Sequence, residues 1–133
     1  MEKIKIIKLV QPKTIVISDQ LYMLSENWHC SMSVNGTTVD VYADQGAMWD
    51  GASIPRIAWT LLGVYPGGRM LAPSLPHDGW CDMHRGKHPR WFTYESQIEI
   101  TPRIRDLIFR ESCRHVGILK PQARIMRSEE HTV

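Results

Sequence analysis

The sequence lacks a long apolar run and an excess of charge of one sign. Its longest apolar stretch, residues 57–64, is interrupted by Thr60 and Gly63 and is much shorter than the ~20 residues that cross a bilayer. Sixteen basic and fourteen acidic residues leave a formal net charge of +2, which gives no electrostatic reason to expect nucleic-acid binding. We therefore expect neither a transmembrane segment nor a nucleic-acid partner.

Cysteine is also scarce. The three cysteines, Cys30, Cys81 and Cys113, are an odd number, and their spacing matches no compact zinc motif and no closed set of disulfides. Free thiols in a reducing cytoplasm are the simplest interpretation. Residues 2–8 alternate Lys with Ile instead of placing a basic segment before an apolar one, so they predict a strand and no signal peptide.

The size and composition are those of an ordinary globular domain. A chain of 133 residues with 43% hydrophobic and 23% charged residues can bury one core. The sequence contains no internal repeat, low-complexity tract or domain linker. We therefore predict a single domain over residues 1–133.

The pattern of turns and apolar residues predicts an α+β fold. Asn35-Gly36 separates two alternating runs and predicts a two-residue hairpin that sets Met32 opposite Val39, Cys30 opposite Val41 and Trp28 opposite Ala43. Residues 4–10 and 14–17 predict one or two further strands. Helices are expected at 57–62, at 68–71, from Pro76, over 101–117 and from Pro121. The prediction is a small N-terminal antiparallel β-sheet followed by three or four α-helices.

His77-Asp78 is the first candidate site feature. Adjacent helical residues point about 100° apart, so the two side chains would take different tasks at one pocket. The imidazole suits proton transfer near neutral pH, and the carboxylate suits a hard cation such as calcium. The alternative is a capping Asp beside an ordinary polar His.

Asp106 is the second feature. Helical projection sets it at the edge of an apolar arc, beside Phe109 and Cys113, where an isolated charge would be costly. It could orient His77 through one ring nitrogen. The alternative is an ion pair with Arg103 or Arg110 on the same helix.

The loop Asp50 to Pro55, reading D-G-A-S-I-P, is the third feature. A structural turn accounts for its Gly, Ser and Pro, whereas Asp50 is placed where a metal ion or a helix N-terminus could use its charge. Weaker candidates are His29 on a predicted strand and the pair His84 and His88. The basic and aromatic residues 85–94 are expected to form a loop.

The order of these motifs resembles a known family. D-G-A-S-I-P, then His77-Asp78, then Asp106 with Phe109 is similar to a family of small phage and prophage proteins of unassigned function, over roughly residues 44–126. In that family an aromatic-leucine type of sequence follows H-D, whereas this chain has Gly79-Trp80-Cys81.

More remotely, the order resembles secreted phospholipase A(2). That likeness implies that His77 is the base that activates water and that Asp106 orients it. It also implies that Asp78 and Asp50 bind Ca²⁺, which would polarise an ester carbonyl. Cys81 is one residue out of step with the cysteine that usually follows H-D in that class.

The resemblances together predict a function. We expect a phage-encoded, metal-assisted and phospholipase-like ester hydrolase, acting on membrane lipid or other cell-envelope material when the phage enters or leaves its cell. The alternative is a non-enzymatic structural or accessory protein of the virion, for example in the tail, with phage structural proteins as partners. The expected location is the virion or the host cytoplasm.

Overall fold

The computed structural model describes residues 2–18, 21–49 and 71–118. In these residues two antiparallel sheets meet two helices. The larger sheet has the order β1-β4-β5-β7 and contains β1 (Ile4–Lys8), β4 (Trp28–Val34), β5 (Thr37–Ala43) and β7 (Phe92–Glu95). The smaller sheet has the order β2-β3-β6 and contains β2 (Thr14–Ser18), β3 (Leu21–Leu24) and β6 (Met48–Trp49).

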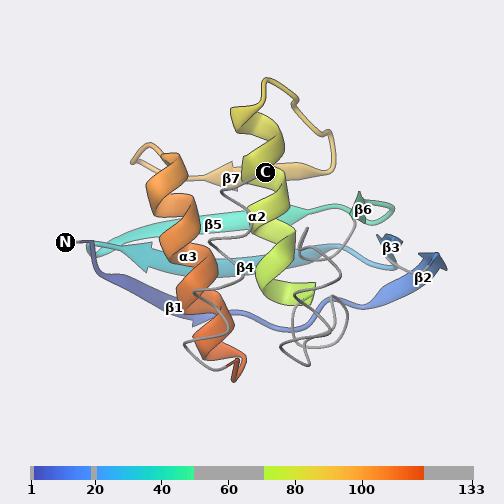
Figure 1. Cartoon of the computed structure of the whole chain (residues 1–133), viewed down its shortest axis with the longest axis horizontal. Coiled ribbons are helices and arrows are strands. Elements are labelled where there is room, and N and C mark those ends of the chain that lie inside the picture. Colours follow the sequence, from blue (N-terminus) through green and yellow to red (C-terminus); the bar gives the residue numbers. More distant parts are fainter. Residues whose placement is uncertain (1, 19–20, 50–70, 119–133) are drawn as a thin grey trace, which may run out of the picture.

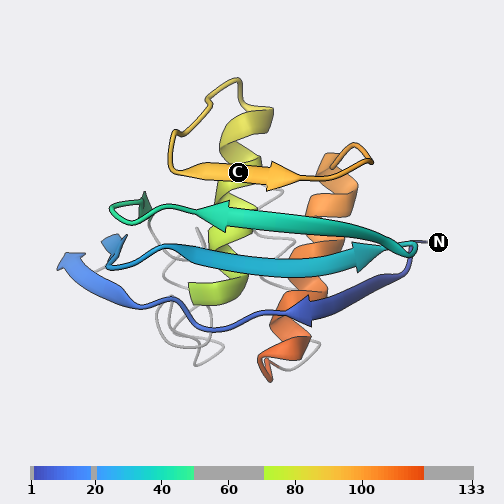
Figure 2. The same ribbon diagram turned by 180° about the vertical axis from the view of Figure 1, so that it is seen from behind.

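Both described helices cover the same face of the larger sheet. Helix α2 (Leu71–His84) and helix α3 (Pro102–His115) lie side by side in front of the sheet in Figure 1, and both lie behind it in Figure 2. The opposite face of the sheet carries no described helix. Neither described helix is long and apolar enough to cross a membrane.

The predicted hairpin between β4 and β5 is confirmed. Asn35 and Gly36 have φ angles of 53° and 85°, the two positive values that a tight two-residue hairpin turn needs. The pairs Met32 with Val39, Cys30 with Val41 and Trp28 with Ala43 form as predicted, and all six side chains are buried. Short-range turn chemistry therefore sets the register of the central strands.

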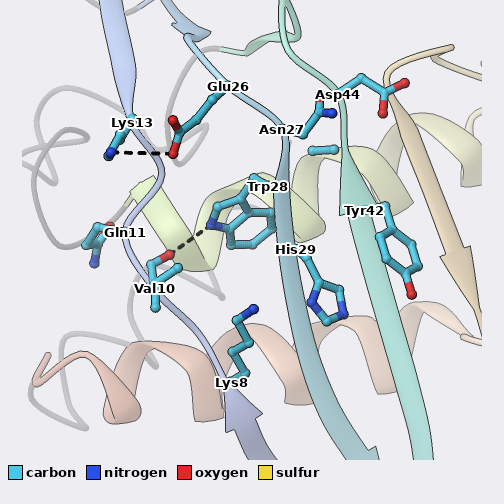
Figure 3. A pocket seen from close by; sticks show the side chains of 11 residues that line it. Lys8, Val10, Gln11, Lys13, Glu26, Asn27, Trp28, His29, Tyr42 and Asp44 are labelled. Atoms are coloured by element: carbon cyan, nitrogen blue, oxygen red, sulfur yellow. Dashed lines mark hydrogen bonds and ion pairs between the residues drawn. The ribbon is translucent and has the colours of Figure 1, made fainter.

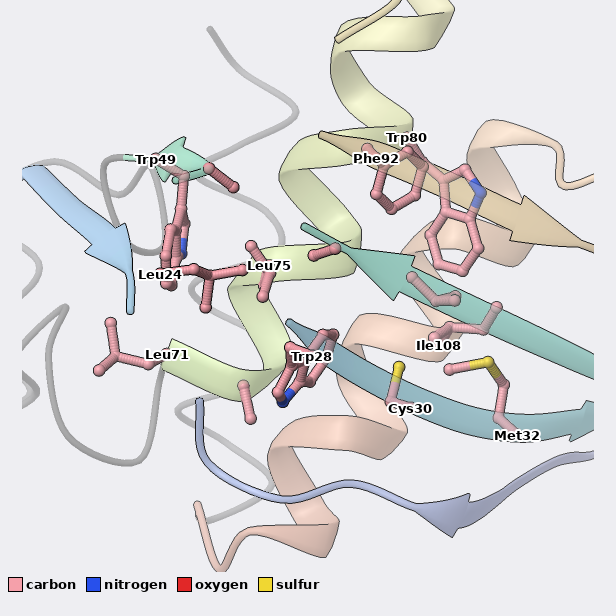
Figure 4. Packing of buried hydrophobic residues seen from close by; sticks show 14 of the residues in the cluster. Leu24, Trp28, Cys30, Met32, Trp49, Leu71, Leu75, Trp80, Phe92 and Ile108 are labelled. Carbon is pink, nitrogen blue, oxygen red and sulfur yellow. The ribbon is translucent and has the colours of Figure 1, made fainter. Parts of the chain in front are cut away.

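The core lies between this sheet and the helices. Its largest fully buried side chains include Trp80 of α2, Met32 of β4 and Phe109 of α3. Figure 4 shows Leu75 from α2 pointing toward Leu24, and Trp80 beside Phe92. Helix α3 begins as predicted: Thr101 accepts a hydrogen bond from the Ile104 amide at 3.2 Å, and Pro102 is the first helical residue.

The predicted fold class is wrong. The described chain is mainly β, with seven strands in two sheets and two helices, and β7 follows α2 instead of preceding the helices. Residues 92–94, expected in a loop, pair with β5 because Phe92 can bury against the core while its backbone bonds to that strand. Helix α2 begins at Leu71, before the start predicted at Pro76. Burial of Leu71, Ala72 and Leu75 stabilises the first turn by more than the interior Pro76 destabilises it. The helices predicted at 57–62 and from Pro121, and most of the one predicted at 68–71, lie outside the described residues.

Strand β2 is one of the two edge strands of the smaller sheet as described. It pairs with β3 along one edge, and a register shift interrupts the pairing between Val16 and Ser18. Ile15, Val16 and Ile17 are 48%, 65% and 48% exposed. Three consecutive apolar side chains therefore face solvent on an edge strand.

Candidate functional site

The candidate site lies where α2 packs against α3. His77 of α2 and Asp106 of α3 are 3% and 5% exposed, and His77 Nε2 is 3.2 Å from Asp106 Oδ1. An ionised carboxylate accepts hydrogen bonds and cannot donate them, so Nε2 carries the proton of this bond. In a neutral imidazole, Nδ1 is then the nitrogen that can accept a proton.

Asp106 has a cationic neighbour on its own helix. Arg105 Nε is 3.2 Å from the same Oδ1 atom, and the Arg105 side chain is 13% exposed. Arg103, one of the two partners considered from the sequence, lies 3.3 Å from Glu2. The positive charge of Arg105 offsets the cost of burying the Asp106 carboxylate and favours its ionised form.

Arg105 also joins this site to the end of α2. Its Nη1 group donates to His84 Nδ1 at 3.0 Å, and His84 Nε2 donates to the Ile100 carbonyl at 2.9 Å. A guanidinium is a donor and a carbonyl an acceptor, so these two bonds fix the neutral tautomer of His84. His84 therefore contacts Arg105, and both members of the predicted pair, His84 and His88, are exposed.

A thiol also lies beside His77. Cys81 Sγ lies 3.6 Å from His77 Nδ1 and 3.8 Å from its Nε2. The Phe109 ring packs against the imidazole, with ring centroids 4.7 Å apart. The sequence contained the signal for Cys81, because residues four apart on a helix share a face.

A comparison with protein families identifies the group. Residues 22–128 match the family described as "Protein of unknown function (DUF1353)". The chain belongs to the DUF1353 family. The match includes His77, Cys81 and Asp106 and begins after β1 and β2. Searches of curated proteins and of solved structures found no match.

Membership of DUF1353 confirms the expected likeness to a family of unassigned function. The phage origin and the phospholipase-like arrangement stay predictions. Asp78, predicted as a metal ligand, is partly buried on α2, and Asp50 lies outside the described residues. Within the described ranges no three His, Cys, Asp or Glu side chains are grouped to hold a metal ion. Calcium binding therefore also stays a prediction.

His29 lies elsewhere in this DUF1353 chain, on the sheet face away from the helices. Its Nε2 is 2.9 Å from Asp40 Oδ1, and its ring stacks on Tyr42 with centroids 4.8 Å apart. His29 and Tyr42 line a pocket of about 510 Å³ beside the segment between β1 and β2 (Figure 3). The lining residues do not include His77, Cys81 or Asp106, so the two features are separate.

Proposed function

We propose that this DUF1353 protein is a hydrolase in which His77 is the general base and Asp106 orients it. The observation that carries the proposal is the buried contact between His77 Nε2 and Asp106 Oδ1. A base held by a second group that fixes its tautomer is the arrangement that proton-transfer catalysis needs. The proposed substrate is an ester of lipid or other cell-envelope material, and the proposed setting is phage infection or release.

Each residue has a defined task in this reaction. Nδ1 of His77 takes a proton from the attacking group, and Asp106 stabilises the imidazolium that forms through the bond to Nε2. The imidazolium then returns the proton to the leaving alkoxide, which departs as an alcohol. Arg105 keeps Asp106 ionised, so that its carboxylate stays an acceptor throughout.

Calcium belongs to the proposal through Asp78 and Asp50. Carboxylate oxygens are the ligands that this ion prefers, and both residues are aspartates. A bound ion would polarise the ester carbonyl. Calorimetry with Ca²⁺ on the wild type and on Asp78→Asn tests this part, with binding expected in the wild type and lost in the variant.

One observation favours the second candidate, a structural or accessory protein of the virion. His77 and Asp106 are almost fully buried, and the bonds from Ile100 through His84 and Arg105 to Asp106 tie α2 to α3. A buried polar contact such as His77–Asp106, extended by the exposed bond between His84 and Arg105, can fix the relative position of two helices without catalysis.

The deciding experiment compares activity with stability. Wild type, His77→Gln and Asp106→Asn are assayed on p-nitrophenyl butyrate and on phosphatidylglycerol vesicles, with Ca²⁺ or with a chelator. His29→Gln is the matched control, because His29 also contacts an aspartate but lies on the other face of the sheet. We expect His77→Gln to lower the rate by about 10² to 10⁴-fold and His29→Gln to leave it unchanged.

Urea denaturation of these variants and of Asp106→Ala separates the two candidates. A hydrolase predicts loss of activity in a His77→Gln protein that still folds. No hydrolysis by the wild type, together with a loss of several kcal/mol in Asp106→Ala, would support the structural candidate instead.

A further inference from the structure

We infer that Cys81 is the nucleophile of this site and that hydrolysis passes through an acyl-thioester on its sulfur. This inference rests on the proposed function and adds the class of mechanism. It assigns a role to a residue that the phospholipase-like arrangement leaves unused. The substrate class is a carboxylic ester or another activated acyl group, because a thiolate attacks acyl carbon readily.

The first support is the order of contacts. Cys81 Sγ is 3.6 Å from Nδ1 of His77, and Nε2 of the same ring is 3.2 Å from Asp106. A nucleophile beside a base, with the base held by a third group, is the diagnostic arrangement for covalent catalysis. The imidazole of His77 therefore lies between a thiol and a carboxylate.

The geometry requires a small adjustment. The sulfur is almost equally far from Nδ1 and Nε2, so it lies beside the ring and off the lone-pair axis of Nδ1. The inference requires the thiol to move toward Nδ1 when substrate binds. Catalytic hydrogen bonds are often long or poorly aligned before substrate binds.

Accessibility distinguishes Cys81 from the other two cysteines. Cys30 and Cys113 are 0% exposed, whereas Cys81 is partly exposed at a position four residues after the buried His77. Burial and the nearby Asp40 carboxylate raise the pKa of Cys30 well above its ordinary range, so its thiol stays protonated. Cys81 is therefore the cysteine that can meet both a substrate and a base.

The reaction balances with water as the second reactant. His77 takes the thiol proton, the thiolate sulfur bonds to the acyl carbon, and the ester C–O bond breaks. The alkoxide leaves as an alcohol with the proton from His77. Water then attacks the thioester with His77 again as base, which gives the carboxylic acid and regenerates the thiol.

The first test measures thiol reactivity and needs no substrate. Native wild type and His77→Gln are treated with iodoacetamide at one pH, and alkylation of each cysteine is followed by mass spectrometry. We expect Cys81 to react while Cys30 and Cys113 do not, and His77→Gln to slow Cys81 by about tenfold or more because the thiolate loses its base. An equal Cys81 rate in both proteins would overturn the inference.

The second test traps the intermediate. Brief mixing with p-nitrophenyl butyrate is expected to add a butyryl group to Cys81 in the wild type and to leave Cys81→Ala unmodified and inactive. Cys113→Ala is the matched control and is expected to stay active, with urea denaturation showing that both variants fold.

The outcomes separate this inference from the proposed function. If Cys81→Ala hydrolyses the ester as fast as the wild type while His77→Gln is inactive, His77 activates water directly and the inference is wrong. If the wild type neither hydrolyses the ester nor becomes acylated, both the proposed function and the inference are wrong.

Discussion

Replacing Gly79 with alanine tests how closely α2, the helix that carries His77, packs against Phe92 of β7. A Cβ atom at Gly79 would lie 2.5 Å from both Cγ and Cε1 of Phe92, and it would also contact Cδ1. Ordinary contact begins near 3.4 Å, so the ring or the helix would have to retreat by about 1 Å. Gly79 is therefore expected to be required by the close approach of α2 to β7.

Phe92 has little room to move. It is 5% exposed, and its ring meets Trp80 and Trp91 edge to face, with centroids 5.8 Å and 5.7 Å apart. Overpacking of a core costs about 1–3 kcal/mol, and alanine regains about 1 kcal/mol of helix propensity relative to glycine. Because the ring is confined, we take the upper end of the overpacking cost, which leaves a net loss of about 2 kcal/mol and a fall in Tm of roughly 8 °C.

Urea denaturation and thermal unfolding of Gly79→Ala measure this loss. The double variant Gly79→Ala/Phe92→Leu is the control, because the smaller side chain removes the clash. The two changes should therefore cost less together than the sum of their separate costs. A Gly79→Ala protein at least as stable as the wild type would refute the close approach.

Three further predictions concern single contacts, each measured by urea denaturation. Ser74→Ala should lower the free energy of unfolding by about 1–3 kcal/mol, because the buried Trp49 Nε1 loses its acceptor at 3.0 Å; an unchanged midpoint would contradict this. Asn35→Val should cost about 1–2 kcal/mol, because a β-branched residue must adopt a φ of 53°, whereas Asn35→Gly should cost less. The raised pKa of Cys30 means that the unfolded chain loses this proton first as pH rises above its ordinary value of 9.0. Stability should then fall by up to about 1.4 kcal/mol per pH unit, and a Cys30→Ala protein with the same pH slope would contradict this cause.

Features set by neighbouring residues could be predicted from the sequence. Asn35-Gly36 determines the hairpin because both residues tolerate positive φ, and Thr101 with Pro102 determines the start of α3. The pairing of β6 with β3 and of β7 with β5 could not be predicted, because each joins residues far apart in the chain. Phe92 lies opposite Ala43 only because the helix α2 returns the chain to the edge of the sheet.

The candidate site shows the same division. The proximity of His77 and Asp106 followed from one carboxylate on the packed side of a helix, which needed a partner. Arg105 was missed because it precedes Asp106 directly, and adjacent helical residues point apart; its long side chain nevertheless reaches the same oxygen. Cys81 received no role because it is one residue out of step with the cysteine that usually follows H-D in secreted phospholipase A(2). Its spacing of four residues from His77 was nevertheless visible in the sequence.

The outer strand β2 has a consequence for handling the protein. It presents apolar side chains at Ile15, Val16 and Ile17 on an edge strand, and the pairing shift after Val16 is the local feature that makes this edge less regular. Edge strands of this composition are templates for intermolecular β-pairing. We therefore expect aggregation at high protein concentration to begin at this strand.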